Sequence, residues 1–167
     1  MSKSKIVGMI ALIAFAMGIF LVGDALAGEK VKGRIVCTNS KVQSVNVPDR
    51  EGHVIVLYEG KCVNTVFAGA RYLDGGAVNE VGVVDLLNPK TGEQIFHGYQ
   101  EYILSDGGKI YGRFEFTHVS EGISHGTWEF LYGTGRYEGI KGRGTWAGPN
   151  LGDRWYGNWE GEMELSR

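Results

Sequence analysis

Aromatic residues at every second position of the stretch 126–146 constrain the fold of this chain more than any other feature. Trp128, Phe130 and Tyr132 share one face of an extended strand, and the residues between them face the other way. After a corner that is rich in glycine, the alternation returns and ends at Trp146. Alternation of period two on both sides of a glycine-rich corner predicts two consecutive β-strands.

Similar stretches fill the rest of the chain. The last of them, 154–165, places Trp155, Trp159 and several glycines on one face and polar residues on the other. No amphipathic helix pattern accompanies these strands, so the sheet has to cover its own apolar face, as a closed barrel or a sandwich. Long hairpins with short turns favour the barrel. The expected strands are 31–38, 53–58, 62–67, 77–87, 93–105, 109–119, 126–132, 140–146 and 154–165.

The predicted fold class is therefore all-β: an antiparallel up-and-down β-barrel of about eight strands, preceded by a cleavable signal peptide. Two lysines, the uncharged apolar run 6–22 and an Ala-Leu-Ala sequence ending at Ala27 follow one another in the order of a secretory signal. An uncleaved membrane anchor is the alternative, and the run is at the short limit for spanning a bilayer. We expect residues 1–27 to be removed and residues 28–167 to form one exported domain, periplasmic or extracellular, without membrane association.

Cys37 and Cys62 are the two cysteines of the chain. In an oxidising compartment, such a pair in neighbouring strand-like stretches predicts a disulfide bond. Two buried free thiols are the alternative. Neither the cysteines nor the four histidines show metal-ligand spacing, and we expect no metal and no cofactor.

The composition narrows the range of partners. With 17 basic and 19 acidic residues, the chain has no basic stripe of the kind that binds nucleic acid, so we expect no nucleic-acid partner. Glycine is abundant, at 27 residues against 3 prolines, and it is dispersed among the aromatic residues. Glycine inside strands is typical of tight bends and close backbone approach in a small barrel.

The inward-facing aromatic residues are the candidate binding residues. They either fill the barrel or line a cavity for an apolar ligand, and glycines on the same face favour a cavity by leaving space. His118 shares the parity of Phe114 and Phe116, although a structural histidine near a strand end is the alternative. The candidates for ligand binding are Phe114, Phe116, His118, Trp128, Phe130, Tyr132, Trp146, Trp155 and Trp159. No catalytic residues can be named, because no serine elbow or comparable constellation is present.

The corner 133–142 resembles a pattern of the allene oxide cyclase and dirigent-like barrel families. In those families a Gly-Thr-Gly, an aromatic residue and a further glycine precede a late barrel strand, as Gly133, Thr134, Gly135 and Tyr137 do here. The resemblance covers the C-terminal half, about 92–167. It implies an eight-stranded barrel with a hydrophobic cavity that binds or steers reactive small molecules, and it supplies no catalytic residues.

The sequence therefore predicts an exported barrel that binds a small hydrophobic molecule without catalysis. One alternative is an isomerase or cyclase of the allene oxide cyclase type, so the question of enzymatic activity stays open. Another is a structural or envelope-interaction protein with a filled interior. The sequence leaves the ligand unidentified and the oligomeric state open, a homo-oligomer included.

Overall fold

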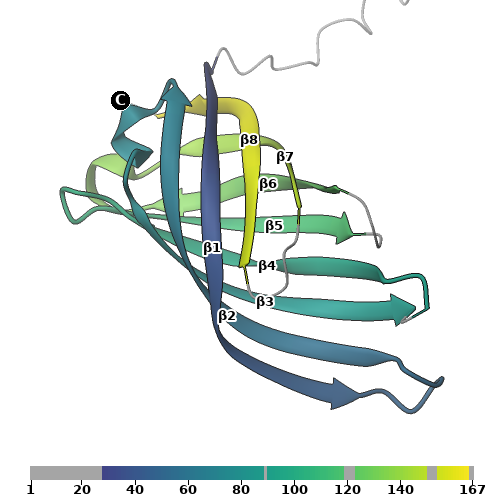
Figure 1. The fold of residues 1–167 in the computed structure, drawn as a ribbon. Helices are drawn as coiled ribbons and strands as arrows, with labels where there is room; N and C mark the ends of the chain where they lie inside the picture. Colours follow the sequence, from purple (N-terminus) through teal and green to yellow (C-terminus); the bar gives the residue numbers. More distant parts are fainter. Residues whose placement is uncertain (1–27, 89, 119–122, 150–153, 166–167) are drawn as a thin grey trace, which may run out of the picture.

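Eight antiparallel strands form a closed barrel in the computed structural model of this chain (Figure 1). The structure describes residues 28–88, 90–118, 123–149 and 154–165, so the expected signal peptide lies outside the described residues. Each strand pairs with the next along the chain, and β8 pairs with β1 to close the sheet. The elements are β1 (Glu29–Asn46), β2 (Val54–Ala68), η1 (Arg71–Leu73), β3 (Ala77–Asn88), β4 (Glu93–Ile103), β5 (Lys109–His118), β6 (Ser124–Gly133), η2 (Gly135–Tyr137), β7 (Lys141–Gly148) and β8 (Arg154–Glu164). The predicted up-and-down barrel is confirmed.

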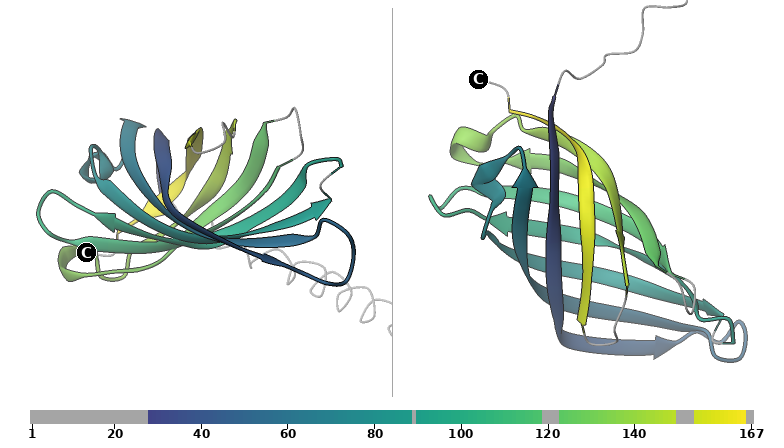
Figure 2. Two further views of the ribbon diagram at one scale, coloured as in Figure 1. Left: turned by 60° about the horizontal axis from the view of Figure 1, so that its bottom comes forward. Right: turned by 45° about the horizontal axis from the view of Figure 1, so that its top comes forward.

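The first hairpin is longer than the sequence indicates. The predicted strands 53–58 and 62–67 are one strand, β2, and β1 continues through polar residues as far as Asn46. Gly60 does not interrupt β2, because it lies opposite Asn39 at a register shift of β1 and points toward Glu80. Strand β8 pairs with β1 only as far as Thr38, so the far half of β1 is paired with β2 alone, while β2 stays paired with β3 as far as Val54 (Figures 1 and 2).

His53 ties this extended hairpin to β3. Its Nδ1 atom lies 2.5 Å from Oδ1 of Asp49, and its Nε2 atom lies 2.8 Å from Oδ1 of Asp85. A neutral imidazole has one N–H donor, whereas the imidazolium has two, so two carboxylates favour the protonated ring. The hydrogen bond to Asp49, and then that to Asp85, raise the pKa of His53 above its usual value of 6.5.

We expect the hairpin end to loosen as the pH rises through the raised pKa of His53. The stabilising effect of a raised histidine pKa is complete below the unfolded-state value and is lost as the pH passes the folded-state value. NMR titration of the His53 ring should give a pKa above 6.5, and Asp85→Asn should lower it. Amide exchange at residues 47–53 should quicken over the same pH interval. A His53 pKa at or below the usual value would contradict this prediction.

Aromatic rings occupy the space that the inner glycines leave. Gly144 and Gly161 face each other across β7 and β8, and an added Cβ on either would lie 2.7 Å from the ring of Trp128. A Cβ on Gly157 would lie 2.1 Å from the ring of Trp146. The glycines therefore allow large rings to lie directly on the backbone of neighbouring strands. The rings fill the space beside these glycines, contrary to the expectation that it stays open for a ligand.

One end of the barrel is closed by side chains of the two short 3₁₀ turns. Leu73 of η1 and Tyr137 of η2 are each 1% exposed, and Ile110 beneath them is fully buried. The rings of Tyr72 and Tyr137 lie 5.3 Å apart and join the two turns. Within the described part of the chain, no helix is long and apolar enough to cross a bilayer.

Cys37 and Cys62 form the predicted disulfide bond, directly opposite each other on β1 and β2. Both side chains point into the barrel and are buried. A disulfide bond persists in oxidising compartments, so this one is consistent with an exported protein.

Candidate functional site

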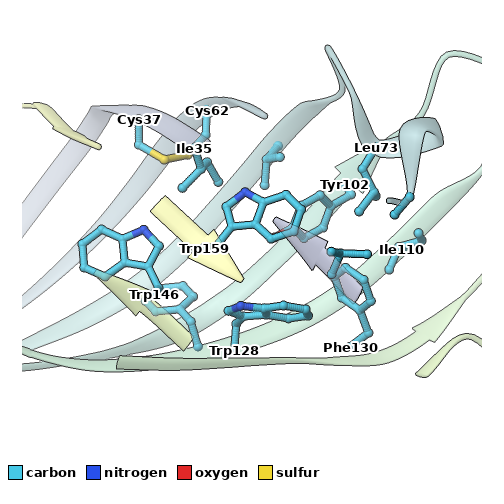
Figure 3. Close-up of a cluster of buried hydrophobic side chains, with 14 of the residues drawn as sticks. Ile35, Cys37, Cys62, Leu73, Tyr102, Ile110, Trp128, Phe130, Trp146 and Trp159 are labelled. Carbon is cyan, nitrogen blue, oxygen red and sulfur yellow. A yellow bond between two sulfur atoms is a disulfide. The ribbon is translucent and has the colours of Figure 1, made fainter. Parts of the chain in front are cut away.

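A small apolar cavity lies in the middle of the barrel. Its volume is about 30 Å³, which is room for one or two water molecules. Side chains from seven of the eight strands and from η1 converge on it (Figure 3). The lining residues are Ile35, Asn64, Leu73, Gln100, Tyr102, Phe114, Phe116, Thr127, Trp128, Phe130, Trp146, Trp155, Trp159 and Met163.

Seven of the nine candidate residues line this cavity. They come from four consecutive strands, and each has its side chain buried. The rings contact one another in tilted and edge-to-face pairs, such as Trp128 with Trp159 at 5.9 Å and Trp146 with Trp155 at 5.4 Å. Such pairs add to the stabilisation that burial alone provides. The seven are Phe114, Phe116, Trp128, Phe130, Trp146, Trp155 and Trp159.

The prediction that Tyr132 faces the interior is wrong, because its side chain is 54% exposed on the outside of the barrel. The strand pairing shifts here: Tyr132 pairs with Tyr111, but Phe130 pairs with Gly112. Leu131 is therefore the extra residue of a β-bulge, and a bulge changes which residues face inward. The ring of Tyr132 stacks on that of Tyr111, with centroids 4.6 Å apart.

His118 is half-buried on the inward parity of β5, as expected, but it does not line the cavity. It is the last residue of β5, and its Nδ1 atom lies 2.8 Å from the Oγ atom of Ser124 on β6. Ser124 is fully buried. The pair joins the ends of two neighbouring strands, which is the structural role named as the alternative.

Three polar residues that the sequence did not single out form one side of the cavity wall. Asn64 of β2 accepts a hydrogen bond from the indole N–H of Trp159, at 2.8 Å, and its own Nδ2 atom donates to the carbonyl of Leu73. An indole N–H can only donate, so this contact fixes the orientation of the Asn64 amide. Gln100 and Tyr102 of β4 complete the polar side.

A buried carboxyl group lies directly behind this wall. Glu80 of β3 is 1% exposed and accepts hydrogen bonds from the hydroxyl of Tyr58 and from Nε2 of Gln100, each at 2.7 Å. The hydroxyl of Tyr102 donates in turn to Oε1 of Gln100, at 2.8 Å. Four side chains thus form one chain of hydrogen bonds from β2 through β3 to the cavity.

Burial dominates the electrostatics of this cluster. Loss of water raises the pKa of Glu80 to about 7, although the hydrogen bonds from Gln100 and Tyr58 oppose this effect. Burial also raises the pKa of Tyr58 and of Tyr102, followed by repulsion from Glu80. Glu80 can therefore exchange a proton near neutral pH, while both tyrosines stay neutral.

Glu80 also lies beside the disulfide bond, without forming a metal site with it. One oxygen of Glu80 and the two sulfur atoms of Cys37 and Cys62 lie within 4.8 Å of one another. Metal ligation by cysteine requires thiolates, and these sulfur atoms are bonded to each other. The three residues therefore form part of the packed interior.

Trp146 is the one tryptophan of the cavity whose buried indole N–H has no hydrogen-bond partner in the described structure. By contrast, the indole of Trp128 donates to the carbonyl of Thr145, and that of Trp159 donates to Asn64. An unpaired buried donor costs free energy, so a ligand oxygen that reached Trp146 would recover it.

The sequence carries a weak signal for the polar wall. Gln100 has the same parity as Phe96 and Tyr102 on β4, so it follows their inward face. Glu80 had no such signal. Val81 and Val83 lie on the opposite face of β3 and favoured that face as the buried one. In the structure Val78, Glu80 and Val84 point inward, and Val81 is exposed.

Comparison with solved structures places this barrel in a known architecture. A pterocarpan synthase dirigent protein superimposes with a TM-score of 0.51 and 10% identity, over 89% of this chain and 95% of the other. A protein of unknown function from the DUF3224 family of Shewanella oneidensis MR-1 superimposes with a TM-score of 0.50 and 15% identity, over 84% of this chain and 98% of the other. No family model matches the chain, and no curated protein matches it. The fold is a dirigent-like β-barrel, and the resemblance to allene oxide cyclases stays a prediction.

Proposed function

We propose that this dirigent-like barrel binds a small, neutral ring compound in its interior and leaves it chemically unchanged. The observation that carries the proposal is the convergence of eight aromatic side chains, seven of them phenylalanine or tryptophan, on one cavity with a polar edge. Ligand sites in proteins combine mostly apolar walls with a few polar groups that orient the ligand. Here Asn64, Gln100 and Tyr102 are those groups, and the aromatic rings form the walls.

Binding requires the rings to move. A cavity of about 30 Å³ is smaller than the roughly 150 Å³ that holds a benzene molecule. Trp146 is the side chain to displace, because its movement breaks no hydrogen bond that the described structure records. Its ring contacts Phe116 at 5.0 Å and Trp155 at 5.4 Å, so its displacement would extend the cavity between strands β5 and β8.

Catalysis of an isomerisation or cyclisation is the second candidate function. Glu80 favours it, because a buried carboxyl group with a pKa of about 7 can hold or release a proton near neutral pH. Gln100 separates that carboxyl group from the cavity, however, and Glu80 is not a lining residue. Appearance of a changed product during incubation would favour this candidate over simple binding.

The site of action that we propose is an exported, oxidising compartment. The disulfide bond between Cys37 and Cys62 and the expected signal peptide support export. Protein purified from that compartment is therefore the material for a ligand search, in which native mass spectrometry would detect and identify any molecule that co-purifies.

A defined test uses naphthalene as the probe and Trp146→Ala as the variant. Truncating Trp146 makes room beforehand, so naphthalene should bind the variant about tenfold more tightly than it binds the unchanged protein. Binding is followed through the methyl NMR signals of Ile35 and Met163, which line the cavity. Tyr132→Ala is the matched control, since it removes an aromatic ring from the outer surface. If naphthalene shifts the methyl signals in none of these proteins, interior binding is refuted.

A further inference from the structure

We infer that Glu80, which lies behind the cavity wall, decides whether Tyr102 offers a ligand a hydrogen-bond acceptor or a hydrogen-bond donor. The consequence for ligands rests on the proposed binding function. The mechanism itself concerns the ligand-free protein and stands on four side chains whose contacts the structure gives.

The recorded contacts match the ionised form of Glu80. Tyr58 donates to Oε1 of Glu80, Nε2 of Gln100 donates to Oε2, and Tyr102 donates to Oε1 of Gln100. All three hydrogen bonds point toward the carboxylate, which can only accept. The hydroxyl hydrogen of Tyr102 is therefore engaged, and its oxygen offers a lone pair to the cavity that the ring lines.

Protonation of Glu80 reverses this chain. The acid then has one hydrogen to donate, and a half-turn of the Gln100 amide brings Oε1 into position to accept it. The Nε2 atom of Gln100 then donates to the oxygen of Tyr102, whose hydrogen is released toward the cavity. The proton comes from solvent and no other bond changes. Every polar group of the cluster keeps a partner except the hydroxyl hydrogen of Tyr102, which turns into the cavity.

Tyr58 cannot take over the role of Gln100. Its hydroxyl has no second hydrogen-bond partner among the described residues, and Tyr58 does not line the cavity. Accepting from Glu80 would therefore leave the hydrogen of Tyr58 with neither a partner nor a cavity to turn into, whereas the hydrogen of Tyr102 has the cavity. The ring also lies against the backbone of Gly82, where an added Cβ would be 2.6 Å from the hydroxyl oxygen. The acidic hydrogen is therefore directed to the oxygen that faces Gln100.

Among the ionisable groups that face one another here, Glu80 is the one that titrates near neutral pH. The other ionisable groups that face it are Tyr58 from β2 and Tyr102 from β4, whose pKa values burial raises further from neutrality. Cys37 of β1 and Cys62 of β2 are tied up in the disulfide bond. No basic side chain of the described residues pairs with Glu80. With its pKa raised to about 7 by burial, both arrangements are populated near neutral pH.

The first experiment tests the switch without any ligand. In isotope-labelled protein, the side-chain amide signals of Gln100 should move with pH, with a midpoint near the raised pKa of Glu80. In Glu80→Gln they should not move, because the introduced amide holds Gln100 permanently in the arrangement of the protonated state. Gln100 signals that stay constant between about pH 5 and about pH 9 in the unchanged protein would overturn the inference.

The second experiment tests the consequence with two neutral probes of similar size, acetophenone as an acceptor and para-cresol as a donor. Lowering the pH from about 8.5 to about 5.5 should raise the affinity ratio of acetophenone to para-cresol about tenfold, the value of roughly one hydrogen bond. Glu80→Gln and Tyr102→Phe should each give a ratio that is independent of pH. A constant ratio in the unchanged protein overturns the assignment of specificity to Glu80. Failure of both probes to bind at any pH counts against the binding function, and the Gln100 titration then decides the switch alone.

Discussion

Trp159→Ala is expected to lower the free energy of unfolding by about 4 kcal/mol, a typical loss for truncating a buried tryptophan. The indole is 8% exposed and packs edge-on against Trp128. It also lies over Gly33, where an added Cβ would be 2.4 Å from the ring. Truncation would thus empty the centre of the barrel, and it would leave the Oδ1 atom of buried Asn64 without its donor.

Urea unfolding of paired variants separates the two parts of this loss. Trp159→Phe keeps a ring in place but removes the N–H, so it should cost roughly 1–3 kcal/mol from the unsatisfied Asn64. Tyr99→Ala is the control on the outer face, where a side chain 64% exposed should change stability by less than about 0.5 kcal/mol. Equal effects of Trp159→Ala and Tyr99→Ala would mean that Trp159 is not at the centre of the packed interior.

The closed barrel was predictable because period-two alternation on strand after strand leaves an apolar face that only closure can cover. Parity alone then placed Trp128, Phe130, Trp155 and Trp159 correctly. It failed at Tyr132, because parity counts residues along one strand and a bulge depends on the pairing of two strands.

How the interior is packed was less predictable than which residues face it. A glycine in an inward position shows that a side chain is absent, but it does not show what occupies the space. Here Trp146 lies over Gly157 and Trp128 lies over Gly144 and Gly161, so small residues and large rings are complementary. Such complementarity links residues on different strands, and one sequence carries no record of which strands meet at which register.

Glu80 was missed for a related reason. A charged residue in a strand, here between Asn79 and Val81, is usually expected to face solvent, since an unpaired buried charge is costly. Its burial becomes tolerable only through Tyr58 and Gln100, which come from the strands on either side. The compensation is thus a property of the folded sheet.

The stability of the protein is expected to fall by about 3 kcal/mol, relative to Glu80→Gln, as the pH rises from about 4.5 to about 8. Burial raises the pKa of Glu80 from 4.5 to about 7, so between these values the folded protein holds a proton that the unfolded chain has released. Stability falls with rising pH wherever the folded state binds more protons. The neutral amide of Glu80→Gln removes this dependence and keeps hydrogen bonds to Tyr58 and Gln100.

Urea unfolding of both proteins across this pH range measures the difference, because every other titrating group contributes equally to the two. Glu101→Gln is the matched contrast on the outer face of β4. The hydrogen bond from Lys109 is the largest cause that lowers the pKa of Glu101, followed by that from Asn79. A lowered carboxyl pKa stabilises the fold above the unfolded-state value. As the pH rises toward that value, Glu101→Gln should therefore become less stable than the unchanged protein. As the pH rises further, toward the raised pKa of Glu80, Glu80→Gln should become more stable than the unchanged protein. Parallel stability curves for these two proteins would show that Glu80 does not bind its proton more tightly in the folded state.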